Sequence, residues 1–286
     1  MDIYVLRTGP LVAKTRSLCV FLGQLMGMAV RAKVLLPLNL APFVWKRLVR
    51  ETVTVENVLE TDRGTRTMLK YLRETAASCD EATAEQIIGG DTWTCHLSDG
   101  TVHNLLPGGG EREVLPSEIN AYIEAIERAR VGEAEDQLCA VREGLVDVLP
   151  GIPLELLRWS ELEEAVCGRR EVSLDELQAC VQYEGSYSES HEAVVRFWQA
   201  MASFTAKERG RWLRFTTGRA RLPPRGTRRF KIIIDRRPHR SDEELQDILP
   251  TASTCSSAFH LPSYRSVEEM ASKIRIAISC ADVDGD

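Results

Sequence analysis

Apolar residues at helical spacing, together with residues that start helices, constrain the fold of this chain more than any other feature. Four stretches repeat an apolar side chain every three or four positions, the pattern of an amphipathic helix. They carry Ile119, Ile123 and Ile126; Leu138, Val141, Leu145 and Val148; Val194, Phe197, Trp198 and Met201; and Val267, Met270, Ile274 and Ala277. Capping boxes, in which Ser or Thr precedes Glu by three positions, mark helix starts at Ser160, Ser173, Thr205 and Ser266. The chain is therefore predicted to be mostly helical.

Strand patterns are fewer. Residues 93–97 alternate apolar and polar side chains up to Asp99-Gly100, a type I′ turn signal, and predict a hairpin that returns through residues 102–106. Residues 230–234 predict a short buried strand and residues 257–261 another. Strands among many helices, without a repeating strand–helix unit, predict an α+β fold.

Composition restricts the class of protein. The chain has 286 residues, 44% of them hydrophobic and 27% charged, which suits a globular protein with a sizeable core. A net charge of −6 excludes a uniformly basic coat for nucleic acid. The longest apolar stretch, residues 18–30, is too short to span a bilayer and lies too far along the chain for a signal peptide. We expect a soluble protein of the cytoplasm, with the nucleus as an alternative, that has no membrane partner.

A basic segment interrupts this acidic background. Residues 206–240 contain 13 Lys or Arg side chains against Glu208 and Asp235. A solvated basic face is the preferred interpretation, and a surface for an acidic or phosphate-bearing partner is the alternative. Trp212 and Phe215 lie within the segment but fit the buried stripe of their own helix better than a role in stacking on bases.

The eight cysteines are too widely spaced for a zinc site or a redox pair, since no two are closer than 13 residues. We expect free thiols in a reducing compartment, no metal and no cofactor. Cys255 differs from the others because it lies in a polar stretch, Thr251 to Thr254, without periodicity. His260 follows five residues later, but a Cys–His protease pair is a weak hypothesis, because such partners come from distant segments.

One segment resembles a known family. "LPTASTCSSAFHLPSYRSVEEM" is similar to the catalytic loop of HECT-type ubiquitin ligases, which carry Leu-Pro, then Thr-Cys, then Leu-Pro-x-Tyr before the last helix. Further family-like strings lie in order along the chain before this segment. Their residues are most similar to those of the large HERC subgroup. They are "FLGQLMGMAVRAKVLLPLNLAPFVWK", "LLPGGG" with "AVREGL", "WSELEEAVCG", "YEGSY" and "FTAKERGRWLRFTTGRARLP".

The resemblance implies a bilobal α+β domain. Residues 1–168 would form a mostly helical N-lobe, whose small β-hairpin subdomain, about residues 68–122, binds the ubiquitin-charged conjugating enzyme. Gly168, Arg169 and Arg170 would form the hinge, and residues 171–286 the catalytic C-lobe with a short sheet. Tyr122 matches an aromatic position that the family uses for the conjugating enzyme, with simple helix packing as the alternative.

The same resemblance implies the chemistry. Cys255 would accept ubiquitin as a thioester and pass it to a substrate lysine, which needs no metal or cofactor. Thr254 would hydrogen-bond the sulfur or the oxyanion, and Arg221 would support the loop. The acidic residues Asp282, Asp284 and Asp286 would assist lysine deprotonation, or form a solvated tail.

The chain departs from the family pattern at several points. Ser256 stands where most members have Phe, and Ser253 where many have His or another larger polar residue. If the family's Phe packs in the core, Ser256→Phe is expected to stabilise the C-lobe or speed transfer. The first part of the N-lobe is expected to be missing, as is the family's aromatic residue near the C-terminus. These departures leave open an alternative function, a catalytically weakened module that docks ubiquitin or the conjugating enzyme. Nucleic-acid binding ranks below both.

Overall fold

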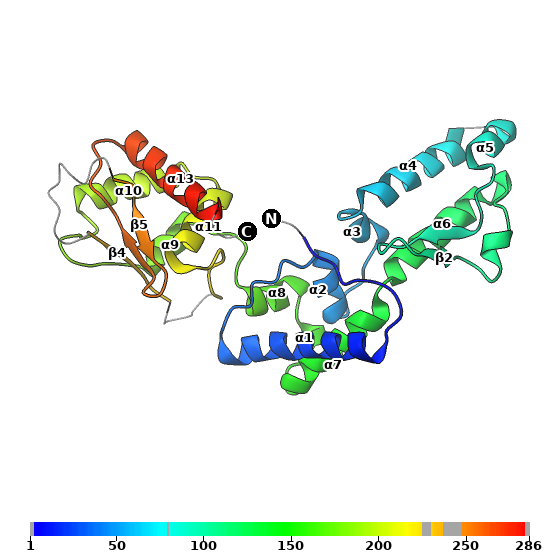
Figure 1. Cartoon of the computed structure of the whole chain (residues 1–286), viewed down its shortest axis with the longest axis horizontal. Coiled ribbons are helices and arrows are strands. Elements are labelled where there is room, and N and C mark those ends of the chain that lie inside the picture. Colours follow the sequence, from blue (N-terminus) through cyan, green and yellow to red (C-terminus); the bar gives the residue numbers. More distant parts are fainter. Residues whose placement is uncertain (1–2, 79, 225–229, 237–247, 284–286) are drawn as a thin grey trace. The chain divides into compact units, whose positions relative to one another are not determined.

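The computed structural model describes residues 3–78, 80–224, 230–236 and 248–283. The chain forms two compact units, residues 1–166 and 167–286, which we call unit 1 and unit 2. Figure 1 shows both units, with many of their elements labelled. No helix in the described ranges is long and apolar enough to cross a membrane.

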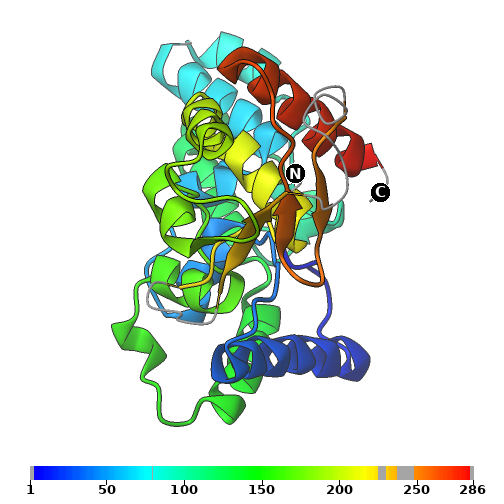
Figure 2. The same cartoon turned by 90° about the vertical axis from the view of Figure 1, so that its left-hand side faces the viewer.

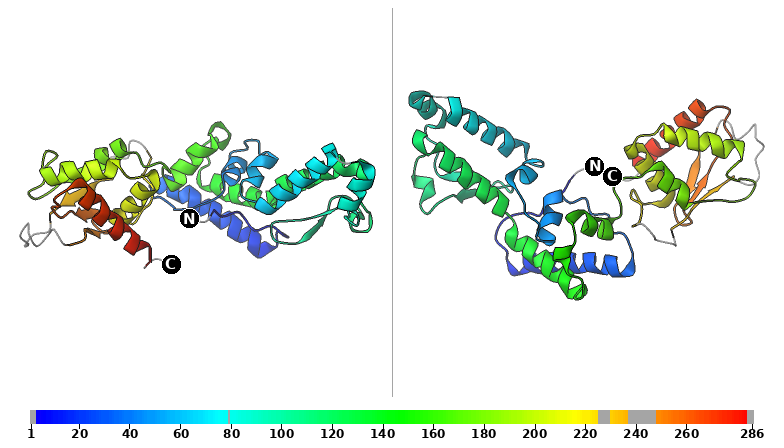
Figure 3. Two further views of the ribbon diagram at one scale, coloured as in Figure 1. Left: turned by 90° about the horizontal axis from the view of Figure 1, so that it is seen from above. Right: turned by 180° about the vertical axis from the view of Figure 1, so that it is seen from behind.

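The base of unit 1 is a helical layer. It consists of α1 (Ala13–Ala32), α2 (Pro42–Leu48), α7 (Glu135–Val148), the 3₁₀ turn η3 (Leu154–Leu156) and α8 (Trp159–Cys167). Helices α1 and α7 lie side by side along much of their length (Figure 3). Glycines allow this approach, because a side chain on Gly23 would overlap the backbone of Val141, and one on Gly144 the backbone of Val20. The apolar stretch of residues 18–30 thus lies within α1, which packs on α7.

The rest of unit 1 is a small subdomain with a separate core. It consists of α3 (Val55–Leu59), α4 (Arg63–Ser78), α5 (Glu81–Ile88), β1 (Thr94–His96), β2 (Val102–Asn104), η1 (Gly109–Glu111), η2 (Pro116–Glu118) and α6 (Ile119–Gly132). Strands β1 and β2 pair antiparallel, as predicted. The turn is longer than the predicted two-residue type I′, since Leu97 N–H donates to the Thr101 carbonyl, and of Asp99 and Gly100 only the glycine has positive φ.

Unit 2 is an α/β unit. It contains α9 (Leu174–Cys180), β3 (Val181–Tyr183), α10 (Glu192–Ala202), α11 (Ala206–Thr217), β4 (Ile232–Asp235), β5 (Thr251–Ser253), β6 (Ala258–His260) and α13 (Val267–Val283). The four strands form one sheet in the order β3-β4-β6-β5, in which only β5 and β6 are antiparallel neighbours. Figure 2 shows this sheet with its helices from a second direction. The α+β class and the short sheet are confirmed.

The two faces of the sheet differ in chemistry. Ile232, Ile234 and Phe259 are fully buried and belong to the core that α10, α11 and α13 complete. The strand register pairs Asp235 with His260 on the opposite face, where both side chains are only partly buried. Alternation along the strands therefore gives an apolar inner face, and an outer face on which Asp235 and His260 lie beyond Ile233 and Ala258.

Candidate active site: the hairpin that carries Cys255

Cys255 lies at the tip of the β5–β6 hairpin. Residues 254–257 form the turn between the strands, and the Cys255 side chain is exposed. The Ser253 carbonyl accepts hydrogen bonds from the Ser256 N–H and the Ser256 hydroxyl, both at 3.2 Å. The Thr254 carbonyl accepts from the Ser257 N–H at 3.3 Å. The sequence interpretation of residues 251–254 as an irregular loop is thus wrong for 251–253, which form β5.

Aromatic packing anchors the hairpin on its inner face. Phe259 in β6 is fully buried, and its ring lies 5.6 Å from Phe197, 5.5 Å from Trp212 and 6.2 Å from Phe215. Tyr264 is buried just beyond β6, and its hydroxyl donates to the Ile248 carbonyl at 2.6 Å, ahead of β5. The apolar residues of the family-like segment therefore hold both ends of the hairpin, leaving its tip in solvent.

Hydrogen bonds join the strands on the outer face. The His260 ring places Nδ1 2.5 Å from Asp235 Oδ1 and Nε2 3.1 Å from Ser253 Oγ. His260 is thus engaged by Asp235 and Ser253, and within the described residues it makes no hydrogen bond to Cys255. Sequence reasoning noted His260 for its distance from Cys255 along the chain and did not find these two partners.

The other described cysteines have different surroundings. Burial is the largest of the effects that raise the pKa of Cys19, Cys95, Cys139 and Cys180, which disfavours their thiolate forms. Cys167 is buried at the end of α8, and Cys280 is exposed near the end of α13. Cys79 lies outside the described residues. Among the described cysteines, Cys255 alone combines an exposed side chain with a position on a turn.

The predicted supporting residues Thr254 and Arg221 lie near the end of α11 and just beyond it along the chain, respectively. A side chain on Gly218, at the end of α11, would contact Thr254 Cβ at 3.9 Å, so Thr254 lies against this helix end. Arg221 follows three residues later and is half-buried. Ser256 is exposed, and the core near the hairpin is filled by Phe259. Asp284 and Asp286 lie outside the described residues.

The connection between the units is short. In unit 1 the Val166 carbonyl accepts from Leu36 N–H at 2.9 Å, and in unit 2 Arg169 N–H donates to the Leu222 carbonyl at 2.7 Å. Arg169 Nε also donates to the Pro223 carbonyl at 3.1 Å. Gly168 has a φ of 83°, which only glycine adopts without strain. Arg169 is therefore held within unit 2, and Cys167 is buried as the last residue of α8, so Gly168 is the residue between them.

Tyr122 is a packing residue of the subdomain. Only 6% of it is exposed, its ring meets Trp93 edge-on at 5.8 Å, and its hydroxyl donates to the Thr94 carbonyl at 3.0 Å. Burial raises its pKa to about 12. These contacts match the helix-packing alternative. The same subdomain has exposed apolar side chains; they are Met68, Tyr71, Val102 and Leu115.

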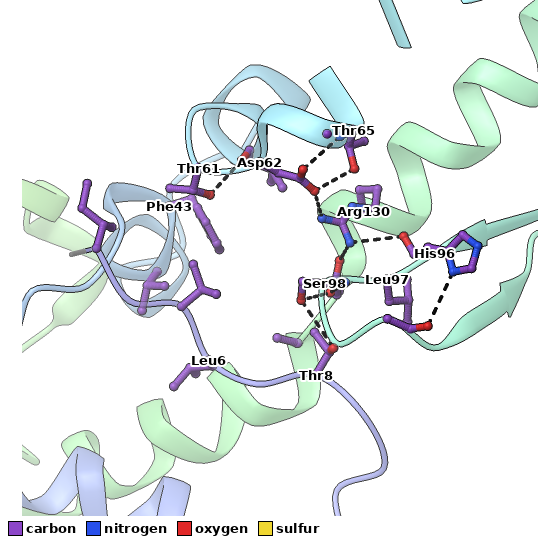
Figure 4. A pocket seen from close by; sticks show the side chains of 18 of the residues that line it. Leu6, Thr8, Phe43, Thr61, Asp62, Thr65, His96, Leu97, Ser98 and Arg130 are labelled. Atoms are coloured by element: carbon purple, nitrogen blue, oxygen red, sulfur yellow. Dashed lines mark hydrogen bonds and ion pairs between the residues drawn. The ribbon is translucent and has the colours of Figure 1, made fainter. Parts of the chain in front are cut away.

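A cavity of about 620 Å³ lies in unit 1 (Figure 4). Arg130, with a side chain only 2% exposed, forms ion pairs there with Asp62 and Glu133. Glu133 also accepts from the backbone N–H of Ser98 at 2.7 Å, so this network fixes the β1–β2 turn to α6. The cavity is lined by the N-terminal segment, α2 and α7 as well as by the subdomain. No cysteine is among its described lining residues, so it is not a candidate site for a thioester.

The basic segment is partly structural. Arg209 Nε donates to the Val172 carbonyl at 2.8 Å, and Trp212 is fully buried in the unit 2 core. Phe215 packs against the same core. The Trp212 ring is therefore not free to stack on a base, and Phe215 is half-buried, in line with their helical stripe. Residues 225–229 and 237–240 of the segment lie outside the described residues.

The described residues thus define an α+β protein of two units, with a candidate thiol nucleophile on a hairpin turn of the second. The HECT-domain (ubiquitin-transferase) family model matches residues 4–283. The chain therefore belongs to the HECT-domain family, as its resemblance implied.

Similar proteins support this assignment. The E3 ubiquitin-protein ligase HERC2 of Homo sapiens is 31% identical over 100% of this chain. The E3 ubiquitin-protein ligases RSP5 of Chaetomium thermophilum and NEDD4 of Rattus norvegicus are each 27% identical over 90% of it. The chain spans 6% of the length of HERC2, 31% of RSP5 and 29% of NEDD4.

Proposed function

We propose that the chain is a ubiquitin ligase domain that accepts ubiquitin from a conjugating enzyme as a thioester on Cys255 and passes it to a substrate lysine. The observation that carries the proposal is the exposed position of Cys255 at the hairpin tip, inside a chain of the HECT-domain family. Its partners would be the charged conjugating enzyme, ubiquitin and a protein substrate.

Two acyl transfers make up the reaction. In the first, the Cys255 thiolate attacks the thioester carbonyl carbon, a new C–S bond forms, and the sulfur of the conjugating enzyme leaves as a thiolate. In the second, a lysine nitrogen attacks the new thioester, a C–N bond forms, and Cys255 leaves as a thiolate. One thioester replaces another in the first step and a more stable amide forms in the second, so the chemistry needs no cofactor.

Unit 1 would hold the conjugating enzyme. We place this surface on the subdomain of residues 68–122, at its exposed side chains Met68, Tyr71, Val102 and Leu115 rather than at Tyr122. The pivot that brings the second unit to its different partners would be Gly168. Tyr71→Asp or Leu115→Asp is expected to slow loading from the conjugating enzyme while leaving loading from a small ubiquitin thioester unchanged.

A loading assay tests the proposal. The chain is incubated with activating enzyme, a panel of conjugating enzymes and ubiquitin, and in parallel with the mercaptoethanesulfonate thioester of ubiquitin, then run on gels with and without thiol reductant. Wild type is expected to gain one reductant-sensitive ubiquitin. Cys255→Ala should lose this adduct, whereas the matched variants Cys139→Ala and Cys280→Ala, at other exposed cysteines, should keep it.

Two results would overturn the proposal. Loading of Cys255→Ala at the wild-type rate would show that another group accepts ubiquitin. A folded wild type that loads from neither source would favour the non-catalytic docking module.

A further inference from the structure

Three polar side chains form a connected chain across the outer face of the unit 2 sheet. Asp235 in β4, His260 in β6 and Ser253 in β5 come from three adjacent strands. The His260 ring joins the other two, with Nδ1 2.5 Å from Asp235 Oδ1 and Nε2 3.1 Å from Ser253 Oγ. Serine, histidine and aspartate in this order are the arrangement by which hydrolases move a proton.

The Asp235 carboxylate determines which groups donate and which accept along these three side chains. A carboxylate only accepts hydrogen bonds, so His260 Nδ1 carries a proton and donates it to Asp235. In the neutral ring Nε2 is then the acceptor, and the Ser253 hydroxyl donates to it. Asp235 thus orients the ring so that its basic nitrogen faces the hydroxyl of Ser253.

Ser253 brings this hydrogen-bonded chain of three side chains close to Cys255. Ser253 is exposed and is the last residue of β5, two positions before Cys255. Two residues of chain place their Cα atoms within about 7 Å of each other. The turn is also closed onto Ser253, whose carbonyl accepts from Ser256 at 3.2 Å.

We propose that Asp235, His260 and Ser253 form a proton-accepting chain for the transfer of ubiquitin from Cys255 to lysine, an inference that rests on the proposed function. Before the attack, the lysine ammonium gives a proton to Ser253 Oγ, while the Ser253 hydroxyl proton moves to His260 Nε2. The freed amine then attacks the thioester carbonyl carbon, the C–N bond forms and the C–S bond breaks. The nitrogen passes its second surplus proton to water, Cys255 leaves as a thiolate, and the imidazolium later returns its proton to solvent.

The transfer of ubiquitin to lysine needs a proton acceptor more than the loading of Cys255 does. A lysine amine is almost fully protonated near neutral pH, whereas a thiol ionises far more readily. A nucleophile that is already an unprotonated amine at neutral pH, such as hydroxylamine, does not need the same help. This difference separates proton transfer from a purely structural role of the three residues.

The experiment follows the decay of a preformed thioester. The chain is loaded with ubiquitin, loading is quenched, and loss of the thioester is timed after addition of free lysine or of hydroxylamine. His260→Gln and Asp235→Asn are expected to slow discharge to lysine by about 100-fold, the usual contribution of a positioned base, and discharge to hydroxylamine by less than about threefold. Ser253→Ala should behave likewise, and Ser253→Thr, which keeps the hydroxyl, should restore discharge to lysine.

Control variants separate a specific effect on proton transfer from a general effect of substitution. His103→Gln, at an exposed histidine of unit 1, should change neither rate. If His260→Gln fails to fold, the Ser253→Ala and Ser253→Thr pair decides, because Ser253 is exposed and outside the core. Equal slowing with both nucleophiles, or unchanged discharge to lysine, would overturn the proton-transfer role while leaving the Cys255 thioester intact. A wild type that forms no thioester would overturn the proposed function itself.

Discussion

At the scale of single residues, Glu208 shows how one carboxylate stabilises unit 2. Its Oε2 accepts from the Thr205 N–H at 2.8 Å, which closes the capping box of α11, and its Oε1 accepts from Arg275 Nε of α13 at 2.7 Å. The Thr205 N–H, followed by the Arg275 guanidinium, lowers the Glu208 pKa from 4.5 to about 2. The ionised carboxylate therefore joins a helix start to a second helix.

Glu208→Gln should lower the stability of unit 2 in a pH-dependent way. A depressed pKa means that the stabilisation is complete above pH 4.5 and is lost as the pH falls toward about 2. We expect a loss of about 1 kcal/mol at pH 7, the usual cost of a lost cap, and a smaller loss at pH 3. Urea unfolding at both pH values, with the exposed Glu189→Gln as control, measures it. An equal loss at both would contradict the role of the charge.

Ser256 has a different place from the one its family position suggested. Its side chain is exposed and donates to the Ser253 carbonyl at 3.2 Å, and the neighbouring core is filled by Phe259. Ser256→Phe should therefore not stabilise unit 2, because the new ring stays in solvent, and should cost about 1 kcal/mol through the lost hydrogen bond. Thermal unfolding of this variant beside Ser256→Ala checks it. A rise in the melting temperature above wild type would show that a pocket for the ring exists.

At the scale of elements, the α1–α7 pair depends on small residues at its contact. Gly144→Ala would press a methyl group onto the Val20 backbone, so the helices must separate. We expect a destabilisation of about 1–3 kcal/mol, as for overpacked cores. Gly132→Ala is the matched control, because nothing lies within 4 Å of that position, and it should be neutral or slightly stabilising. Denaturant unfolding compares the two, and equal stabilities would contradict this packing.

Helices were more predictable than strands, for physical reasons. The predicted caps at Ser173, Thr205 and Ser266 each accept from the N–H of the Glu three residues later. The box at Ser160 was wrong, since α8 begins at Trp159 and the Glu163 side chain is buried within it. Strand β5 was missed because its short sequence is polar and small, so its identity comes from pairing with β6 and not from its own pattern.

The residues of the candidate site also differ in how far the sequence alone predicts them. Cys255 and Thr254 were predicted from the family-like segment, whose signal is local, and their roles stay predictions. The partnership of Asp235, His260 and Ser253 spans 25 positions and arises only from strand register, which no local pattern encodes. Tyr122 was placed at a partner surface by resemblance alone, and its burial against Trp93 depends on the tertiary fold.

At the scale of the whole molecule, each unit has a core of its own. Phe259 lies in the core of unit 2, and the subdomain of unit 1 has a separate cluster around Ile126. Phe259→Ala should destabilise unit 2 by about 3–5 kcal/mol and leave unit 1 unchanged. Calorimetry should then show one transition moving to lower temperature and another staying in place. A single transition that moves as a whole would contradict independent units.

The identity of the residue that carries ubiquitin is the most direct test of the proposed function. Cys255→Ser should trap ubiquitin as a slower, reductant-resistant oxyester, because the hydroxyl replaces the thiol at the same turn. Peptide mapping by mass spectrometry, without base or reductant, should find the C-terminal residues of ubiquitin attached at position 255. Attachment to any other residue, or to none while wild type loads, would contradict the assignment of Cys255 as the acceptor.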